Sequence, residues 1–306
     1  MVVTISSNTS LIPFREKAFY TQGVVWVFYI NANALWLKTS LNQGVTWASP
    51  VQLNTVCQAV DVCYRETSVY YLARSLYPDS YIDKTYLMYR KGTLNVDGTI
   101  TWLAGEQDVW ASSGFSQDWN YYDGNYIVSM NPAITVDSNG YPWVMIDRIG
   151  FGYYTPYGSC QILKSGRTDG LWSYGRYYVC RSSDGHGNSS YEYNMKMHSL
   201  GSGKILAIWQ SNNSNYSENY FCKVFWDGGW YGELNLGASH GGGYPFSAQR
   251  PRQAIPFYID CWTVGNITHM VFDRFVDWGG VNGIMRYYTY YTTFNVNTNA
   301  TSAYVV

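Results

Sequence analysis

The chain has 306 residues, of which 46% are hydrophobic and 13% charged, with a formal net charge of −1 at pH 7. This composition supports a large core and excludes an intrinsically disordered chain. The small net charge gives no reason to expect nucleic acid or an anionic membrane surface as a partner. No apolar run approaches the roughly 18 residues of a membrane-spanning helix, so no membrane insertion is expected.

Short β-branched or aromatic segments recur from the beginning of the chain to its end. Residues 24–30, 85–89 and 142–146 are examples, and each is bounded by Gly, Asn, Asp or Ser. Such segments are typical of strands separated by turns, and helical periodicity is almost absent. The sequence therefore predicts an all-β protein.

One turn phrase stands out between these strands. Residues 40–47 read Ser-Leu-Asn-Gln-Gly-Val-Thr-Trp, directly after the apolar run 34–37. The Asn42 side chain is expected to accept hydrogen bonds from turn N–H groups, and Gly44 to take a positive φ. Related phrases follow at intervals of roughly 40 to 55 residues, the spacing of four-stranded repeating units. These phrases are residues 97–102, 136–140, 181–187, 225–230 and 276–280.

The segments 40–47, 89–102 and 133–144 resemble the Asp-box, sialidase-like β-propeller superfamily, with Asn42 in place of the usual aspartate. The resemblance implies a six-bladed β-propeller of four-stranded antiparallel sheets, forming a single domain over residues 1–306. It concerns the scaffold. Propellers serve as hydrolases, lectins and adhesins alike, so the activity has to be argued from the site.

Sialidase catalysis, as the resemblance implies, needs three arginines on the substrate carboxylate, a Tyr–Glu nucleophile pair and an Asp acid/base. The usual first-arginine phrase is not matched, because residues 12–16 read Ile-Pro-Phe-Arg-Glu. This favours a binding protein over an enzyme. The alternative is an enzyme that uses two Asp–Arg pairs, each directly after an apolar strand, together with a tyrosine near the end of the sequence. The same two pairs would also suit ion pairs that fix the ends of neighbouring strands. If the chain is an enzyme, its candidate catalytic residues are Asp147, Arg148, Asp273, Arg274 and Tyr287.

The densest group of aromatic and amide side chains is the predicted loop 117–126. Aromatic faces stack on sugar C–H surfaces and polar side chains bind hydroxyl groups, so this composition suits glycan recognition. It also suits a loop that packs on its own aromatic residues. The candidate ligand-binding residues are Trp119, Tyr121, Tyr122, Asp123, Arg148, Arg250, Arg252 and Arg274.

The cysteines and sequons bear on the compartment. None of the six cysteines forms a C-x-x-C pair, and the four histidines are scattered, so no cofactor or metal is expected. The cysteines fit either disulfides in an oxidising setting or buried thiols. N-x-S/T sequons begin at Asn8, Asn188, Asn212, Asn215, Asn266 and Asn299. The N-terminal residues lack a secretory signal pattern, which suits either a trimmed sequence or a virion component.

The sequence thus favours an extracellular or virion-surface adhesion module that recognises cell-surface glycans or glycoproteins, such as a viral host-attachment protein. A homo-oligomer would be natural for a virion adhesin. One alternative is a glycoside hydrolase of the sialidase-like group. A further alternative is a structural surface or capsid-decoration protein without a ligand pocket.

Overall fold

The computed structural model describes residues 16–78, 83–109, 132–151, 156–179, 191–212, 218–226, 229–230, 234–235, 259–279, 284–298 and 300–302. These residues form 22 strands in five antiparallel sheets, in agreement with the predicted all-β class. Among the described residues, no helix combines the length and hydropathy needed to cross a membrane.

Each sheet is built from strands that are consecutive in the chain. The first contains β1 (Glu16–Thr21), β2 (Val24–Asn31), β3 (Ala34–Ser40) and β4 (Val51–Asn54). The second contains β5 (Ala59–Arg65), β6 (Ser68–Pro78), β7 (Asp83–Leu94) and β8 (Ile100–Trp102), with β9 (Gln107–Asp108) also paired to β7. The third contains β10 (Ala133–Val136), β11 (Pro142–Phe151), β12 (Pro156–Ser165) and β13 (Tyr174–Val179).

The last two sheets repeat this plan. The fourth contains β14 (Tyr191–Gly201), β15 (Lys204–Asn212), β16 (Glu218–Trp226) and β17 (Gly229–Trp230), with β18 (Leu234–Asn235) also paired to β16. The fifth contains β19 (Ile259–Val264), β20 (Ile267–Gly279), β21 (Ile284–Asn295) and β22 (Ala300–Thr301).

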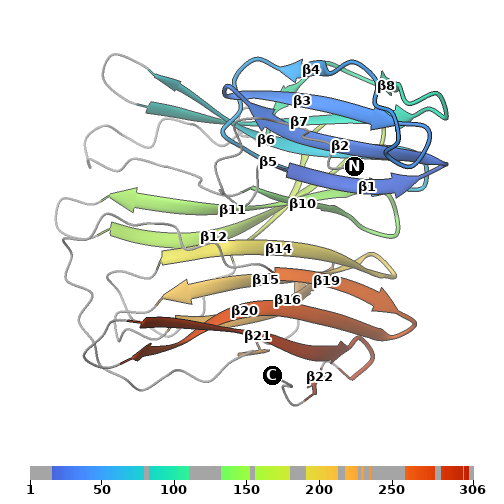
Figure 1. Ribbon diagram of the computed structural model, residues 1–306. Coiled ribbons are helices and arrows are strands. Elements are labelled where there is room, and N and C mark those ends of the chain that lie inside the picture. Colours follow the sequence, from blue (N-terminus) through green and yellow to red (C-terminus); the bar gives the residue numbers. More distant parts are fainter. Residues whose placement is uncertain are drawn as a thin grey trace.

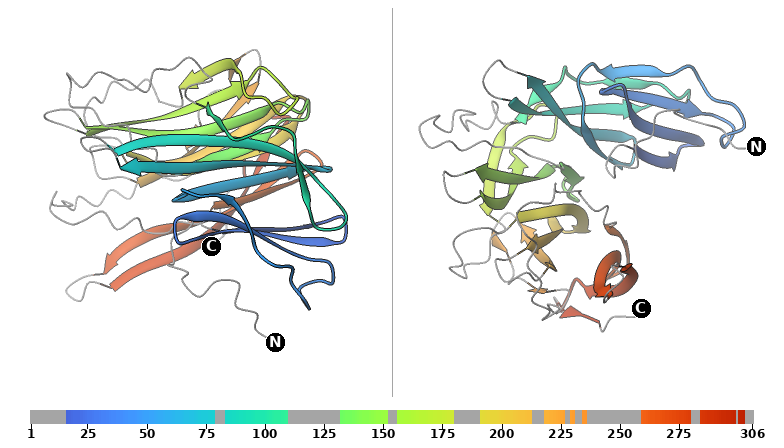
Figure 2. Two further views of the ribbon diagram at one scale, coloured as in Figure 1. Left: turned by 90° about the horizontal axis from the view of Figure 1, so that it is seen from above. Right: turned by 60° about the vertical axis from the view of Figure 1, so that its left-hand side comes forward.

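The sheets follow one another around an arc, with the first and last sheets at its two ends (Figures 1 and 2). The first strand of each sheet contacts the first strand of the next, so β1, β5, β10, β14 and β19 form the inner side of the arc. The predicted four-stranded antiparallel units are confirmed. The predicted number of six units is not confirmed, because the described residues form five.

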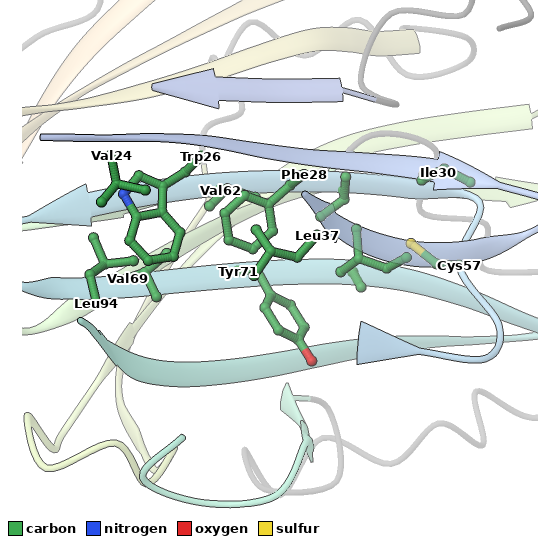
Figure 3. Packing of buried hydrophobic residues seen from close by; sticks show 13 residues of the cluster. Val24, Trp26, Phe28, Ile30, Leu37, Cys57, Val62, Val69, Tyr71 and Leu94 are labelled. Carbon is green, nitrogen blue, oxygen red and sulfur yellow. The ribbon is translucent and has the colours of Figure 1, made fainter. Parts of the chain in front are cut away.

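Apolar layers hold neighbouring sheets together. Between the first and second sheets, Trp26, Phe28, Leu37 and Tyr71 are among the buried residues of one continuous cluster (Figure 3). Comparable clusters lie between the second and third, third and fourth, and fourth and fifth sheets. Each sheet therefore buries side chains against its neighbours, as sheet faces packed on each other require.

The 40–47 turn forms the hydrogen bonds that its sequence predicts. The Oδ1 of Asn42 accepts the N–H of Thr46 at 2.8 Å, and the Oγ of Ser40 accepts the N–H of Gly44 at 2.8 Å. Gly44 has a φ of 91°, in the left-handed region that favours glycine. This turn joins the third and fourth strands of its sheet.

The other turn phrases occupy different places. Residues 97–98 also join a third to a fourth strand, whereas 136–140 spans a first-to-second hairpin and Val276 to Gly279 lie inside β20. The phrase 181–187 is outside the described residues. The phrases that were expected to mark blades therefore mix different kinds of connection, so their number is not a count of the units.

For the described cysteines, the structure distinguishes between the two alternatives of disulfides and thiols. Cys57, Cys63, Cys222 and Cys261 carry thiols and form no disulfide, and three of these four side chains are buried. The alternative of buried thiols is therefore the one found for these residues. Cys57 is part of the apolar layer between the first two sheets (Figure 3).

Candidate functional site

Charged groups from separate sheets meet on the inner side of the arc. Lys17 and Asp260 are each the second residue of their strands, β1 and β19, and Asp61 is the third residue of β5. Lys196 of β14 and the backbone of Ile134 of β10 complete what we call the axial cluster. The first strand of each sheet thus contributes one residue. In β1, β5, β10 and β19 this residue is among the first three of the strand.

The axial cluster contains two ion pairs. The Nζ of Lys17 lies 3.1 Å from the Oδ1 of Asp61, and the Oδ2 of Asp61 accepts the N–H of Ile134 at 2.9 Å. The Nζ of Lys196 lies 3.5 Å from the Oδ1 of Asp260. The Asp61 side chain is 12% exposed, whereas the Asp260 side chain is 77% exposed. Asp260 is therefore the most exposed side chain of the two ion pairs, and Asp61 the least exposed.

The two pairs are electrostatically linked. Burial alone would raise the pKa of the Asp61 carboxyl, but Lys17, Lys196 and the N–H of Ile134 together hold that pKa below its usual range. Asp61 in turn raises the pKa of Lys17 against the opposing effect of burial, and Asp260 adds to the increase. At neutral pH Lys17 is therefore an ammonium group and Asp61 a carboxylate.

Two thiols lie beside these carboxylates in sequence. Burial, reinforced by Asp61, raises the pKa of Cys63, and burial raises the pKa of Cys261 to about 12. Both thiols stay protonated at neutral pH, and a protonated thiol is a poor nucleophile. The cluster offers hydrogen-bond donors and acceptors rather than a nucleophilic sulfur.

The two Asp–Arg pairs lie at this same end of the sheets. In the third sheet, β10 begins opposite Met145 of β11, so Asp147 and Arg148 extend beyond the start of the inner strand. In the fifth sheet, β19 begins opposite Phe272 of β20, so Asp273 and Arg274 extend beyond it in the same way.

The predicted tyrosine follows the same register. Tyr287 of β21 pairs with Phe275 of β20, one position past Arg274. The strand order and register therefore gather Asp147, Arg148, Asp273, Arg274 and Tyr287 at the end of the fold that carries the axial cluster. The remaining candidate ligand-binding residues lie outside the described residues; they are Trp119, Tyr121, Tyr122, Asp123, Arg250 and Arg252.

A Tyr–Glu pair does occur, but at a different place. The Oη of Tyr71 donates to the Oε1 of Glu106 at 2.6 Å, and Asn54 donates to the same oxygen at 2.6 Å. The Tyr71 side chain is buried in the layer between the first and second sheets. Burial and the nearby Glu106 raise the pKa of Tyr71, so its phenol stays protonated. Tyr71 lies in β6 and Glu106 directly precedes β9, both strands of the second sheet, and Asn54 of β4 links the first sheet to the pair. A buried, protonated phenol is not an activated nucleophile.

Within the described ranges, no group of three or more His, Cys, Asp or Glu side chains is arranged to hold a metal ion. Of the two described histidines, His198 bonds to Thr263 at 2.7 Å and His269 to Tyr291 at 2.6 Å. Both bonds join neighbouring strands or sheets.

The comparisons with known proteins identify the scaffold. No family model and no curated protein matches the chain. Among solved structures, a Hadza microbial sialidase, Hz136, superposes with a TM-score of 0.55 at 9% identity, over 95% of this chain and 58% of that one. The scaffold is a β-propeller.

Two further structures support this assignment. The polysaccharide lyase Uly1 superposes with a TM-score of 0.52 at 11% identity, over 98% of this chain and 74% of the lyase. A protein of unknown function from Dyadobacter fermentans gives a TM-score of 0.52 at 10% identity, over 93% and 80% of the two chains. At these identities the similarity concerns the propeller fold, whose sheets are its blades and whose inner strands surround its axis.

Proposed function

We propose that this protein binds glycans at the end of the propeller axis where its inner strands begin. The observation that carries the proposal is the register of the two Asp–Arg pairs, which extend past the inner strands beside the axial cluster. Arginine forks and carboxylates are the groups that hold sugar hydroxyl and carboxylate groups with fixed geometry. The similarity to a sialidase and a polysaccharide lyase supports a glycan ligand.

The protein acts in this proposal as an adhesion module outside the cell or on a virion surface, and a cell-surface glycan or glycoprotein is its partner. The N-x-S/T sequons support an extracellular setting. We also infer that the 40–47 turn is an Asp-box in which Asn42 accepts the turn hydrogen bond that the aspartate usually accepts. Capsid or fibre genes beside the coding gene would support the virion setting, and a polysaccharide-degrading gene cluster would contradict it.

A glycan array with the full chain tests the binding function. Arg148→Ala and Arg274→Ala should each reduce retention by about tenfold or more, since each removes a charged anchor. Arg167→Ala is the matched control, because Arg167 lies in the 166–173 turn at the opposite end of the strands and pairs with Asp169. Retention that is unchanged in both axial variants, or lost equally in the control, would contradict the proposal.

The second candidate function is a glycoside hydrolase that uses Asp147, Arg148, Asp273, Arg274 and Tyr287. The same register favours it, because it brings two carboxylates and a tyrosine to one end of the axis. Fluorogenic sialosides and arabinosides distinguish the candidates. Turnover that Tyr287→Phe abolishes would establish the hydrolase, and binding without turnover would establish the adhesion module.

A further inference from the structure

We propose that the last blade carries a second carbohydrate site, in which the indole of Trp262 stacks on a pyranose ring of a neutral saccharide chain. The Trp262 indole lies on the side of the β19–β22 sheet that faces away from the buried cluster shared with the fourth blade. The polar edge of the site is the Lys196–Asp260 pair of the axial cluster, to which β14 of the fourth blade contributes Lys196. The site rests on the glycan-binding function proposed above only in the class of ligand, because its geometry is independent of the two Asp–Arg pairs.

The indole is held in a stack of three rings across three strands. Trp262 of β19 pairs in register with His269 of β20, and their rings lie 5.1 Å apart with an interplanar angle of 8°. His269 stacks in turn on Tyr291 of β21 at 5.9 Å and forms a 2.6 Å hydrogen bond with its hydroxyl group. One face of the indole is therefore supported by the imidazole, and the side chain needs little ordering when a ligand binds.

The other side of this sheet is used for packing. Cys261, Met270 and Phe294 are buried there in the cluster shared with the fourth blade. Because side chains alternate along a strand, Asp260, Trp262 and Val264 lie together on the opposite side of β19. Trp262 is 45% exposed and Val264 is 63% exposed. An aromatic plane with this exposure, set in a rigid stack, is a contact surface rather than a core element.

Polar groups lie next to the indole. Asp260 precedes Trp262 by two residues, a separation of about 7 Å along the strand. Its carboxylate is 77% exposed and lies 3.5 Å from the ammonium group of Lys196. A carboxylate accepts hydrogen bonds from sugar hydroxyl groups, and an ammonium group donates to hydroxyl and ring oxygens.

The charges indicate which saccharide fits. Lys196 and Asp260 carry opposite charges, so the polar edge of the site has no net charge to attract sulfated or uronic chains. The indole takes the C–H face of a pyranose ring, and the ion pair takes its hydroxyl edge. A neutral hexopyranose chain supplies both surfaces.

Affinity electrophoresis of the full chain in gels containing laminarin, xyloglucan or galactomannan tests this site. Retardation by at least one of these polysaccharides is expected for the wild type, and Trp262→Ala should weaken it by about tenfold or more. Trp262→Phe should keep part of it, because phenylalanine preserves a smaller stacking face. Val264→Ala is the matched control, because this neighbour on the same side of β19 is also exposed and lies outside the ring stack.

The outcomes separate the two sites. Loss of retardation in Trp262→Ala with retention in Arg148→Ala and Arg274→Ala supports the second site. The reverse pattern overturns it and leaves the axial function standing. Absence of retardation by all three polysaccharides also overturns it. The second site would also be overturned if sedimentation velocity showed a wild-type dimer that Trp262→Ala converts to a monomer. The ring stack would then be an interface between two copies of the chain.

Discussion

The Nζ of Lys17 in the first blade lies 3.1 Å from the Oδ1 of Asp61 in the second blade. The other oxygen of the same carboxylate accepts the N–H of Ile134 in the third blade at 2.9 Å. One carboxylate therefore joins three inner strands, and its interaction with Lys196 extends to a fourth. This arrangement makes Asp61 the central group of the axial cluster.

Replacement of Asp61 by asparagine should lower the free energy of unfolding by about 2–3 kcal/mol, because it leaves a half-buried ammonium group without its carboxylate. Urea denaturation followed by far-UV circular dichroism measures the loss. Glu66→Gln is the control, because the Glu66 side chain is 82% exposed and its replacement should change nothing measurable. Equal stability of the two variants would show that the Asp61 contacts contribute little.

Stability should also depend on His198. Burial, with a smaller contribution from Lys196, lowers the pKa of His198 from 6.5 to about 4, while Asp260 opposes the shift. Between these two pH values the unfolded chain binds a proton at this position that the folded chain does not. The free energy of unfolding should therefore be highest above about pH 6.5 and fall by about 2 kcal/mol as the pH drops to 4.

His198→Gln should flatten this part of the profile, because glutamine can keep the contact with Thr263 and does not titrate. Denaturation midpoints at half-unit pH steps measure the slope. The Asp61 carboxyl contributes to stability in a lower pH range, because its pKa is depressed. This contribution is complete above the ordinary pKa range of a carboxyl group and is lost as the pH falls through the lowered pKa. A profile for His198→Gln that matches the wild type would contradict the assignment.

The fold class could be predicted from sequence because strand and turn signals are local. The blade count could not, because similar Asp-Gly turns serve different connections. The third-to-fourth turn of the third blade is residues 166–173, where Asp169 accepts the N–H of Leu171. In the fifth blade Asn295 accepts the N–H of Asn297. Neither turn was predicted, since neither repeats the full 40–47 phrase.

The axial cluster could not be predicted, because its members come from strands that are far apart in the chain. Lys17 and Asp61 are separated by 44 residues. Each has a second charged residue in its own strand, Glu16 in β1 and Arg65 in β5. A charged residue among aromatic or apolar residues was the available signal. The two Asp–Arg pairs were proposed from sequence because each follows an apolar run, and the register places both at one end of the axis. Their role stays a prediction.

Asn42→Ala should destabilise the protein by about 1 kcal/mol, because it removes the acceptor for the N–H of Thr46. Asn42→Asp should be close to neutral, because the carboxylate keeps this acceptor and the Thr46 hydroxyl group can donate to it in place of receiving the Asn42 amide. Thermal melts of the three proteins compare them. A large loss in Asn42→Asp would show that the amide donor is the essential group of the turn.

Tyr71→Phe distinguishes a structural Tyr–Glu pair from a catalytic one. The substitution removes the phenol that donates to Glu106 at 2.6 Å and leaves that carboxylate with the amide of Asn54. The free energy of unfolding should fall by about 1–2 kcal/mol, because a partly buried acceptor loses one donor. Tyr20→Phe, at a tyrosine that is 55% exposed, is the control and should cause no measurable loss. Glycan binding should be the same in both variants, because Tyr71 is buried between two blades. A hydrolytic activity that Tyr71→Phe abolished without loss of stability would contradict the structural role.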